Sequence, residues 1–474
     1  MPRPMAPRWK PFRLSLSIMT ELLPAVRARL LVAAATTTLA LTPLNAQQPT
    51  VIPLSLGDAG RLAAQQSALA QGARLRADEA QARVRERRAD LLPTVSSYVQ
   101  QAGRTFNTST LGIDFPSSPG VPPLFDPQGQ IEGPVNTIDI RGQVRQNLLD
   151  FGALGRVRSA QASARSSNAD AEATAEQAAT TATSTYVKAM RADADLYARQ
   201  ADTLLATDLL RIAESQLQAG TGVGLDVTRA QAQLAATRSS LITSRNARDH
   251  AHIDLLRALS LPIGTEVVLT DSLSTTAAAT EAVPDESTLV AQALRSRPDL
   301  LAEQERVRAA QQGLSAIKAE RLPTIGVVAD DGAIGKNGAK LLNTYTWALQ
   351  VTVPIFDGFQ REARVQEQQS MVKEAQIRQR DVEQQAQADV HGAVLDLAAA
   401  REQLSAASER LRLAEQELAQ ARDRFNAGVA GNADVVNASL ALTASRTLVN
   451  DAEAGYQLAR VSLARATGSV TTLR

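Results

Sequence analysis

The pentapeptide Asp-Leu-Leu-Pro-Thr at residues 90–94 recurs as Glu-Arg-Leu-Pro-Thr at residues 320–324. Further along the chain, Leu-Leu-Asp-Phe-Gly at residues 148–152 recurs as Ile-Phe-Asp-Gly-Phe at residues 355–359. Motifs that repeat in the same order at long separation indicate an internal duplication. We therefore expect a fold built from two copies of one supersecondary plan.

A third motif completes the comparison of the two copies. Ala-Gly, followed a few residues later by Asp-Val, occupies residues 219–227 and again residues 427–435. Together the motifs predict a first repeat at residues 47–261, an inter-repeat segment at 262–285 and a second repeat at 286–474. Each copy is expected to contain, in order, a helical stretch, two short strands, a very long helix and a shorter helix.

Long stretches without proline predict that most of each copy is helical. The first helical stretch, residues 58–91 and 288–321 in the two copies, ends at Leu-Pro because proline disfavours helix for the residue before it. Small and apolar residues recur with heptad-like spacing in the later stretches, which predicts coiled-coil packing of helices about 100 Å long. The remaining helices are expected at residues 153–219, 226–260, 359–427 and 434–467.

Short segments with alternating apolar and polar residues predict strands. In the clearest of them Tyr345, Trp347 and Leu349 alternate with threonine, alanine and glutamine. Such alternation over about ten residues is typical of a strand with one face in lipid and the other in water. For a single segment, the alternative is a half-buried strand of a soluble sandwich. The strands are expected at about 94–106, 136–149, 324–330 and 344–355.

The number of strands decides between these alternatives. Four strands attached to helices provide no second sheet to cover an apolar face, and they are too few to close a barrel, which needs about eight. A bilayer does not tolerate an open sheet edge. We therefore expect other copies of the chain to complete the sheet within a membrane, with exposed loops at residues 106–135 and 331–343.

The N-terminus has the features of a secretory signal peptide. Arginines precede an apolar run at residues 30–41, and small residues lead to an expected cleavage site after Ala46. We expect residues 1–46 to be removed during export, whether translation starts at Met1 or at Met19.

The composition excludes several classes of function. With no Cys and only 3 His, the chain cannot form disulfides, cysteine-ligated metal sites or thiol nucleophiles, and neither a metal nor a cofactor is expected. His250 and His252 point to different sides of a helix, so we expect them, like His391, to be ordinary surface or packing residues. Asp193 and Asp195 also face different ways on a helix, so we expect them to be solvated surface residues. The chain carries 50 Lys and Arg against 49 Asp and Glu, without a basic cluster interleaved with aromatic residues, so nucleic acid is not an expected partner. No enzyme is predicted.

The glycine-rich segment at residues 220–224 follows a helix instead of a strand, so it is not a dinucleotide-binding loop. We expect a helix reversal, in which glycine ends one helix and Asp226 caps the next. Residues 428–434 predict the same turn in the second copy, with Asp434 as the cap.

These features together resemble the TolC family of outer membrane efflux proteins. The resemblance rests on the duplicated plan, the Leu-Pro-Thr strand entries, the Val-Pro-Ile-Phe-Asp-Gly strand exit at residues 353–358 and the paired turns, and it covers about residues 54–468. It implies a homotrimer whose strands form a twelve-stranded β-barrel in the outer membrane, continuous with a twelve-helix coiled-coil α-barrel in the periplasm. It also implies passive export of small molecules or proteins, with a periplasmic adaptor protein and an inner-membrane transporter as partners. The inter-repeat segment would lie in the equatorial region of the tunnel.

By the same resemblance, the turns at residues 220–226 and 428–434 form the periplasmic tip. Asp226 and Asp434 match the tip acids of the family, and Asn437 stands where a second acid is expected. Carboxylates around a narrow opening attract cations, so these three residues are the candidate aperture; the alternative is that the acids only cap helices. Ala430 stands where a basic residue that could hold the aperture shut is expected. The candidate adaptor-docking residues are Gly220, Thr221, Gly222, Val223, Gly224, Gly428, Val429, Ala430 and Gly431.

The sequence leaves one alternative from a different class of protein. A secreted coiled-coil scaffold, or a periplasmic adaptor without membrane strands, would share the long helices and the export signal. Its strands would be covered by protein, and the mature chain would dissolve without detergent. The surroundings of the apolar strand faces therefore distinguish the two hypotheses.

Overall fold

The protein is represented by a computed structural model, which describes residues 52–111, 129–273, 285–336, 340–427, 429 and 431–473. The expected signal peptide at residues 1–46 lies outside the described residues, as does part of the expected loop at 106–135.

Helices form most of the described chain, and each copy adds two longer strands. The elements of the first copy and of the inter-repeat segment are β1 (Ile52–Leu54), α2 (Leu56–Gln66), α3 (Ala68–Ala89), β2 (Thr94–Asn107), η1 (Thr108–Leu111), β3 (Ile131–Leu149), α4 (Phe151–Gln218), α5 (Gly224–Ala258) and β4 (Val267–Leu269). The elements of the second copy are α6 (Glu286–Ser296), α7 (Pro298–Ala319), β5 (Thr324–Lys336), β6 (Leu342–Thr352), α8 (Gln360–Asn426), α9 (Asn432–Thr467) and η2 (Val470–Thr472).

The first helical stretch of each copy is broken into two helices. Between α2 and α3, Ser67 has an extended backbone, and its hydroxyl accepts a hydrogen bond from the N–H of Ala70 at 3.2 Å. Between α6 and α7, Arg297 is extended because Pro298 follows it and starts the next helix. The prediction of single helices at residues 58–91 and 288–321 is therefore wrong, since a capping serine and a proline each begin a new helix.

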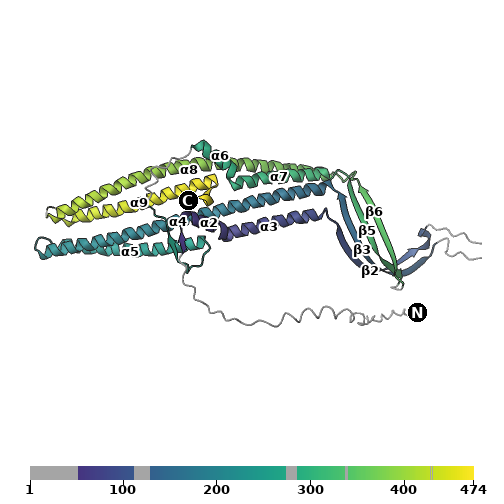
Figure 1. The fold of residues 1–474 in the computed structure, drawn as a ribbon, viewed down its shortest axis with the longest axis horizontal. Coiled ribbons are helices and arrows are strands. Elements are labelled where there is room, and N and C mark those ends of the chain that lie inside the picture. Colours follow the sequence, from purple (N-terminus) through teal and green to yellow (C-terminus); the bar gives the residue numbers. More distant parts are fainter. Residues whose placement is uncertain are drawn as a thin grey trace, which may run out of the picture. The chain divides into compact units, whose positions relative to one another are not determined.

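The long helices α4 and α8 run through two halves of a helical layer (Figure 1). On the side of the sheet the helices lie in the order α3, α4, α7, α8, and on the side of the turns in the order α5, α4, α9, α8. In the half that carries the turns, α5 and α8 are therefore the two outer helices. Small residues allow close packing of neighbouring helices: a Cβ added at Gly155 of α4 would lie 2.6 Å from the Cβ of Ala316 on α7.

Short segments pack against the middle of α4. β1 pairs in parallel with β4 of the inter-repeat segment. Tyr186 of α4 is fully buried, and its hydroxyl donates to the carbonyl oxygen of Leu54 at 2.8 Å. Burial raises the pKa of the Tyr186 phenol to about 12. Near the C-terminus, the carboxylate of Glu176 accepts a hydrogen bond from the N–H of Val470 at 3.1 Å. Segments from both ends of the described chain are thus held by α4.

The four longer strands form one antiparallel sheet in the order β2, β3, β5, β6. β3 of the first copy pairs with β5 of the second, so the sheet joins the two repeats. Arg141 of β3 lies opposite Tyr98 of β2 and Gly332 of β5. β2 and β6 are the two edges of this sheet, and edge strands offer backbone groups for pairing with a further strand.

Three of the strands differ in length from the prediction. β3 begins at Ile131 instead of about residue 136, and β5 continues to Lys336 instead of ending near residue 330. The glycine and aspartate residues after 330 are typical of a turn, but pairing with β3 and β6 keeps them extended. β6 ends at Thr352, shortly before Pro354, which has no N–H to continue the ladder.

One face of the sheet is apolar and uncovered. Val95 and Val99 of β2 are 77% and 73% exposed, and Tyr345 and Trp347 of β6 are 75% and 72% exposed. Because these side chains remain accessible in the described part of the chain, no described element covers them. A secreted scaffold, whose strands protein would cover, does not fit this face.

Candidate functional site

The first tip turn, between α4 and α5, has the backbone of a Schellman motif. Gly220 has a φ of 75°, in the left-handed region that favours glycine. The N–H of Thr221 donates to the carbonyl of Gln216 at 2.9 Å, and the N–H of Gly220 donates to that of Leu217 at 3.1 Å. These bonds satisfy carbonyl groups at the end of α4 while the chain reverses.

The second tip turn, between α8 and α9, repeats the bond that spans five residues. The N–H of Val429 donates to the carbonyl of Arg424 at 3.0 Å. Gly428 and Ala430, which are predicted to lie in this turn, are outside the described residues. Val429 is 69% exposed and Val223 of the first turn is 58% exposed, so each turn presents an apolar side chain to its surroundings.

Neither Asp226 nor Asp434 caps a helix, contrary to the prediction. The N-cap residues are Val223 and Gly431, and neither makes a side-chain capping bond. The helices begin two residues earlier than expected, which places both acids within the first turn. There a carboxylate gains about 0.3–1 kcal/mol from the helix dipole.

The environments of the two acids differ. The Asp226 side chain is 18% exposed, and its carboxylate lies 3.8 Å from the guanidinium of Arg229. Asp434 is exposed, and no described residue forms an ion pair with its carboxylate. Asn437, the third candidate aperture residue, is also exposed and lies one turn further along α9. The second copy thus contributes solvated polar groups, and the first an ion pair.

Asn432, which is not among the site residues predicted from the sequence, joins the two turns. It begins α9 and is fully buried, and its Nδ2 donates to the carbonyl oxygen of Asp226 at 3.0 Å. Its Oδ1 has no hydrogen-bond partner among the described residues. The repeat aligns Asn432 with Gly224 of the first copy. That difference between the copies is the sequence feature that could have identified it.

An apolar cluster lies behind the second turn. Phe425, at the end of α8, and Val435, at the start of α9, are both buried in it. The other buried members come from α4, α8 and α9: Leu209, Ala414, Leu418, Ala438 and Leu442. Since α5 supplies none of them, the bond from Asn432 is a main link between the start of α5 and the second hairpin.

Polar side chains tie α4 to α9 above the tip. Asp202 is almost fully buried and accepts hydrogen bonds from Arg199 at 3.3 Å and from Arg446 at 3.0 Å. Further along, Asn450 donates to Asp195 at 2.8 Å. These contacts fix the spacing of the two hairpins.

Asp193 connects α4 to α5. Its carboxylate is bonded to Arg248 at 3.1 Å and to His252 at 3.0 Å. Burial by itself raises the pKa of Asp193, but the hydrogen bonds and charges of His252 and Arg248 outweigh burial and hold the pKa below its usual 3.8. The prediction that Asp193 and Asp195 are solvated surface residues is therefore wrong, because both bond to a neighbouring helix.

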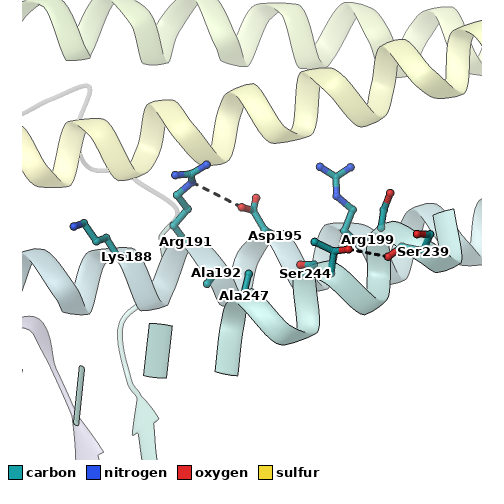
Figure 2. A pocket seen from close by; sticks show the side chains of 10 residues that line it. Lys188, Arg191, Ala192, Asp195, Arg199, Ser239, Ser244 and Ala247 are labelled. Atoms are coloured by element: carbon teal, nitrogen blue, oxygen red, sulfur yellow. Dashed lines mark hydrogen bonds and ion pairs between the residues drawn. The ribbon is translucent and has the colours of Figure 1, made fainter. Parts of the chain in front are cut away.

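A groove of about 570 Å³ lies between α4 and α5 (Figure 2). Lys188, Arg191 and Arg199 of α4 line one side, and serine and threonine side chains of α5 line the other. Arg191 is already paired with Asp451 of α9 at 2.6 Å, as Arg199 is with Asp202. The groove therefore offers hydroxyl groups and one ammonium group, which is a solvated polar surface.

The face of the sheet opposite the apolar one carries a charged cluster. The guanidinium of Arg141 donates to Asp139 at 3.0 Å, to Asp330 at 2.6 Å and to Thr344 at 3.1 Å. Gly332, opposite Arg141, has no room for a Cβ, which would lie 2.3 Å from a backbone oxygen of β3. Glycine is needed there because β3 and β5 approach so closely.

Within the described residues, no helix combines the length and the apolar composition that spanning a membrane would require. The described residues also bring together no group of three or more His, Asp or Glu side chains that could hold a metal ion.

The fold is that of several solved outer-membrane channels. The chain is similar to the outer-membrane channel OprN, with a TM-score of 0.71 and 18% identity over 87% of this chain and 90% of that one. It is similar to the Campylobacter jejuni CmeC outer membrane channel, with a TM-score of 0.70 and 16% identity over 87% and 85%. It is also similar to the open state of the Neisseria gonorrhoeae MtrE channel, with a TM-score of 0.71 and 16% identity over 88% and 89%. A comparison with curated proteins gives no significant match.

The chain belongs to the outer membrane efflux protein family, whose model matches residues 60–260 and 289–469. The protein is thus an exit duct of the outer membrane, with a large helical portion in the periplasm. The family consists of channel proteins and not of enzymes. The resemblance stated from the repeated motifs is confirmed.

Proposed function

We propose that the chain closes its barrel and its tunnel as a homotrimer and serves a tripartite efflux system. The observation that carries this proposal is the uncovered apolar face between the open edges of β2 and β6. Three copies would supply twelve strands, an even number within the range of closed outer-membrane barrels. The polar face with the Arg141 cluster would then line the water-filled interior.

The tip turns would form the periplasmic end of the tunnel. In this proposal a periplasmic adaptor protein docks on the two turns, where Val223 and Val429 offer exposed apolar contacts. An inner-membrane transporter supplies the energy, because the duct itself has no catalytic role. Asp226, Asp434 and Asn437 line the aperture, and Asp434 contributes most of its charge because it has no partner among the described residues.

The same proposal assigns a role to each segment of the chain. Residues 1–46 direct export, residues 47–261 and 286–474 are the two repeats, and residues 262–285 form the equatorial segment. The pairing of β4 with β1 beside the middle of α4 supports the equatorial position of that segment.

The experiment compares two substitutions on opposite faces of β6. Trp347→Lys places a charge on the apolar face and is expected to reduce insertion, since lysine facing lipid costs about 2–4 kcal/mol at the bilayer midplane. Thr346→Lys, on the polar face, is the matched control and is expected to insert normally. The measurement is heat-modifiable migration in outer membrane fractions, with the native mass in detergent reporting the trimer.

Two outcomes would contradict the proposal. Equal insertion of both variants would show that the apolar face does not meet lipid. A wild-type protein that is soluble without detergent, or monomeric in it, would exclude the trimeric duct.

A further inference from the structure

A second groove, of about 530 Å³, lies at the end of the helical layer that meets the sheet. It is lined by all four helices of that half, α3, α4, α7 and α8, which lie side by side there (Figure 1). Arg87 is near the end of α3, and Arg156 and Arg364 are near the starts of α4 and α8. Because these helices connect directly to strands of the sheet, the groove lies just beneath it.

Small side chains leave space between the helices at this groove. Ala80 of α3 and Gly313 of α7 both line it, and a Cβ added at Gly313 would lie 3.2 Å from the amide nitrogen of Gln368. Ser163 and Ser167 of α4 add hydroxyl groups that bond to no described residue. A concave surface of this volume with a few polar groups is typical of small-molecule sites.

The groove is positively charged. Four arginines and two glutamates line it, which gives a formal charge of +2. Glu320 is shared by two of the arginines, since Arg364 donates to it at 2.7 Å and Arg156 lies 3.7 Å from it. The other acid near Arg156 is Asp150, at 3.5 Å, and Arg87 forms no ion pair with a described residue. Charge-assisted bonds are about 2.7–2.9 Å long, so Arg87 and Arg156 keep donors for a further anion.

The groove and the anchored chain segments lie on opposite faces of the helical layer. Residues on one face of a coiled-coil helix recur every seven positions, so Tyr186, which holds Leu54, shares its face of α4 with Arg165. Ser163 of the groove is two residues from Arg165, which is about 200° around the helix. In a closed ring the anchored segments must lie outside, because inside they would obstruct the tunnel. The groove then faces the tunnel.

We propose that this groove is a binding site for organic anions that pass through the duct. The guanidinium groups of Arg87 and Arg156 and the hydroxyl of Ser163 hold a carboxylate or phosphate group of the solute, and its apolar body lies over the small residues. The inference rests on the proposed function, since the groove faces a tunnel only when the ring is closed. Three subunits provide three such grooves beneath the barrel, each binding weakly enough to release the solute.

The experiment measures the block of single channels by naphthoate, a planar organic anion, in bilayers of uncharged lipid. We expect the wild-type current to fall as the naphthoate concentration rises, because the bound anion occupies the tunnel wall. Naphthamide has the same rings without the charge and is expected to leave the current unchanged at the same concentration. Equal block by the two compounds overturns the proposal, since it would show that charge does not hold the probe.

Two arginines of α3 provide the test and its matched control. Arg87→Gln removes the unpaired cation of the groove and is expected to raise the naphthoate concentration for half-maximal block about tenfold. Arg85 is also exposed and forms no ion pair with a described residue. It lies about 200° around the helix from Arg87, away from the groove. Arg85→Gln is therefore expected to leave the block unchanged.

A third substitution has the opposite sign. Glu320→Gln removes the carboxylate that Arg364 and Arg156 share, so both guanidinium groups become available to the anion. We expect the concentration for half-maximal block to fall severalfold. A gain in affinity cannot come from a damaged fold, so this variant complements the loss at Arg87.

The unblocked conductance separates the two proposals. Channels that conduct normally but are blocked equally in wild type and in Arg87→Gln overturn the anion site and leave the duct standing. Equal effects of Arg85→Gln and Arg87→Gln also overturn the site, because the block would then depend only on the total charge. A wild-type protein that forms no channel overturns both proposals.

Discussion

The two helical hairpins, α4–α5 and α8–α9, share one backbone hydrogen bond at the turn, from Thr221 to Gln216 and from Val429 to Arg424, and differ in the side chains around it. In the first, Asp226 is partly buried beside Arg229; in the second, Asp434 is exposed and pairs with no described residue. The repeat aligns Gly224 with Asn432, and only the asparagine reaches across to the other hairpin. The duplication has kept the Ala-Gly and Asp-Val motifs of the turns and has varied the residue between them that joins the two hairpins.

The largest effect is expected from Asn432→Asp. The substitution removes the donor to the Asp226 carbonyl and places a buried carboxylate next to that oxygen, which we expect to cost about 3 kcal/mol. The two turns should then separate more readily, as measured by hydrogen exchange at the start of α5. Lowering the pH should reverse part of the effect, because a protonated carboxyl group can donate again.

The matched control for this prediction is Asn437→Asp, which makes the same chemical change at an exposed position of the same helix. It is expected to change hydrogen exchange very little. Equal effects of the two substitutions would show that the bond from Asn432 does not hold the hairpins together.

The next effect concerns the charge of the proposed aperture. Asp434→Ala should raise the single-channel conductance in planar bilayers and lower the preference for cations severalfold, since one charge attracts a cation by about 1 kcal/mol at 4 Å in water. Asp226→Ala should do less, because Arg229 already compensates that carboxylate. If Asp434→Ala leaves conductance unchanged, Asp434 contributes only to the start of its helix.

Two glycine substitutions in the first turn should have opposite signs. Gly220→Ala forces alanine into a φ of 75° and should lower the free energy of unfolding by about 1 kcal/mol. Gly224→Ala lies at the start of α5 with open space around the added Cβ and should raise it by about 0.5 kcal/mol. Thermal unfolding of the two variants measures both. A loss of the same size at Gly224 would mean that the turn cannot accept a side chain at either position.

The smallest effect is a pH dependence of the first hairpin. Because the pKa of Asp193 is lowered in the folded chain, its contribution to stability is present above pH 3.8 and is lost as the pH falls through the folded pKa. The side chain is 38% exposed, so the loss should stay below about 1 kcal/mol. Unfolding by denaturant at two pH values, in wild type and in Asp193→Asn, measures it. An equal pH dependence in the variant would assign the effect to another group.

The sequence predicted the elements that depend on local pattern. The positive φ of Gly220, the long helices and the alternating strands all follow from residues close to one another in the chain. The break between helices at Arg297 could also have been predicted from Pro298, whereas no proline marks the break at Ser67.

The remaining features depend on contacts between distant residues. Asp226 and Asp434 have the composition of N-caps, but the helices begin earlier because Val223 and Gly431 adopt the capping conformation without a side-chain bond. β5 extends past residue 330 only because two neighbouring strands pair with it. Asn432 became recognisable when the structure brought Asp226 within 3.0 Å of its amide.

The anchoring of segments from both ends of the described residues on α4 bears on the order of the repeats. Leu54 is held by Tyr186 and Val470 by Glu176, and these anchors are about 15 Å apart along one helix. A linker of a few residues could therefore join the segments at Leu54 and Val470, with a new break placed between the repeats. A circularly permuted chain that begins with the present second copy is expected to keep the helix and strand contacts of the described residues, so this architecture does not depend on which half is translated first.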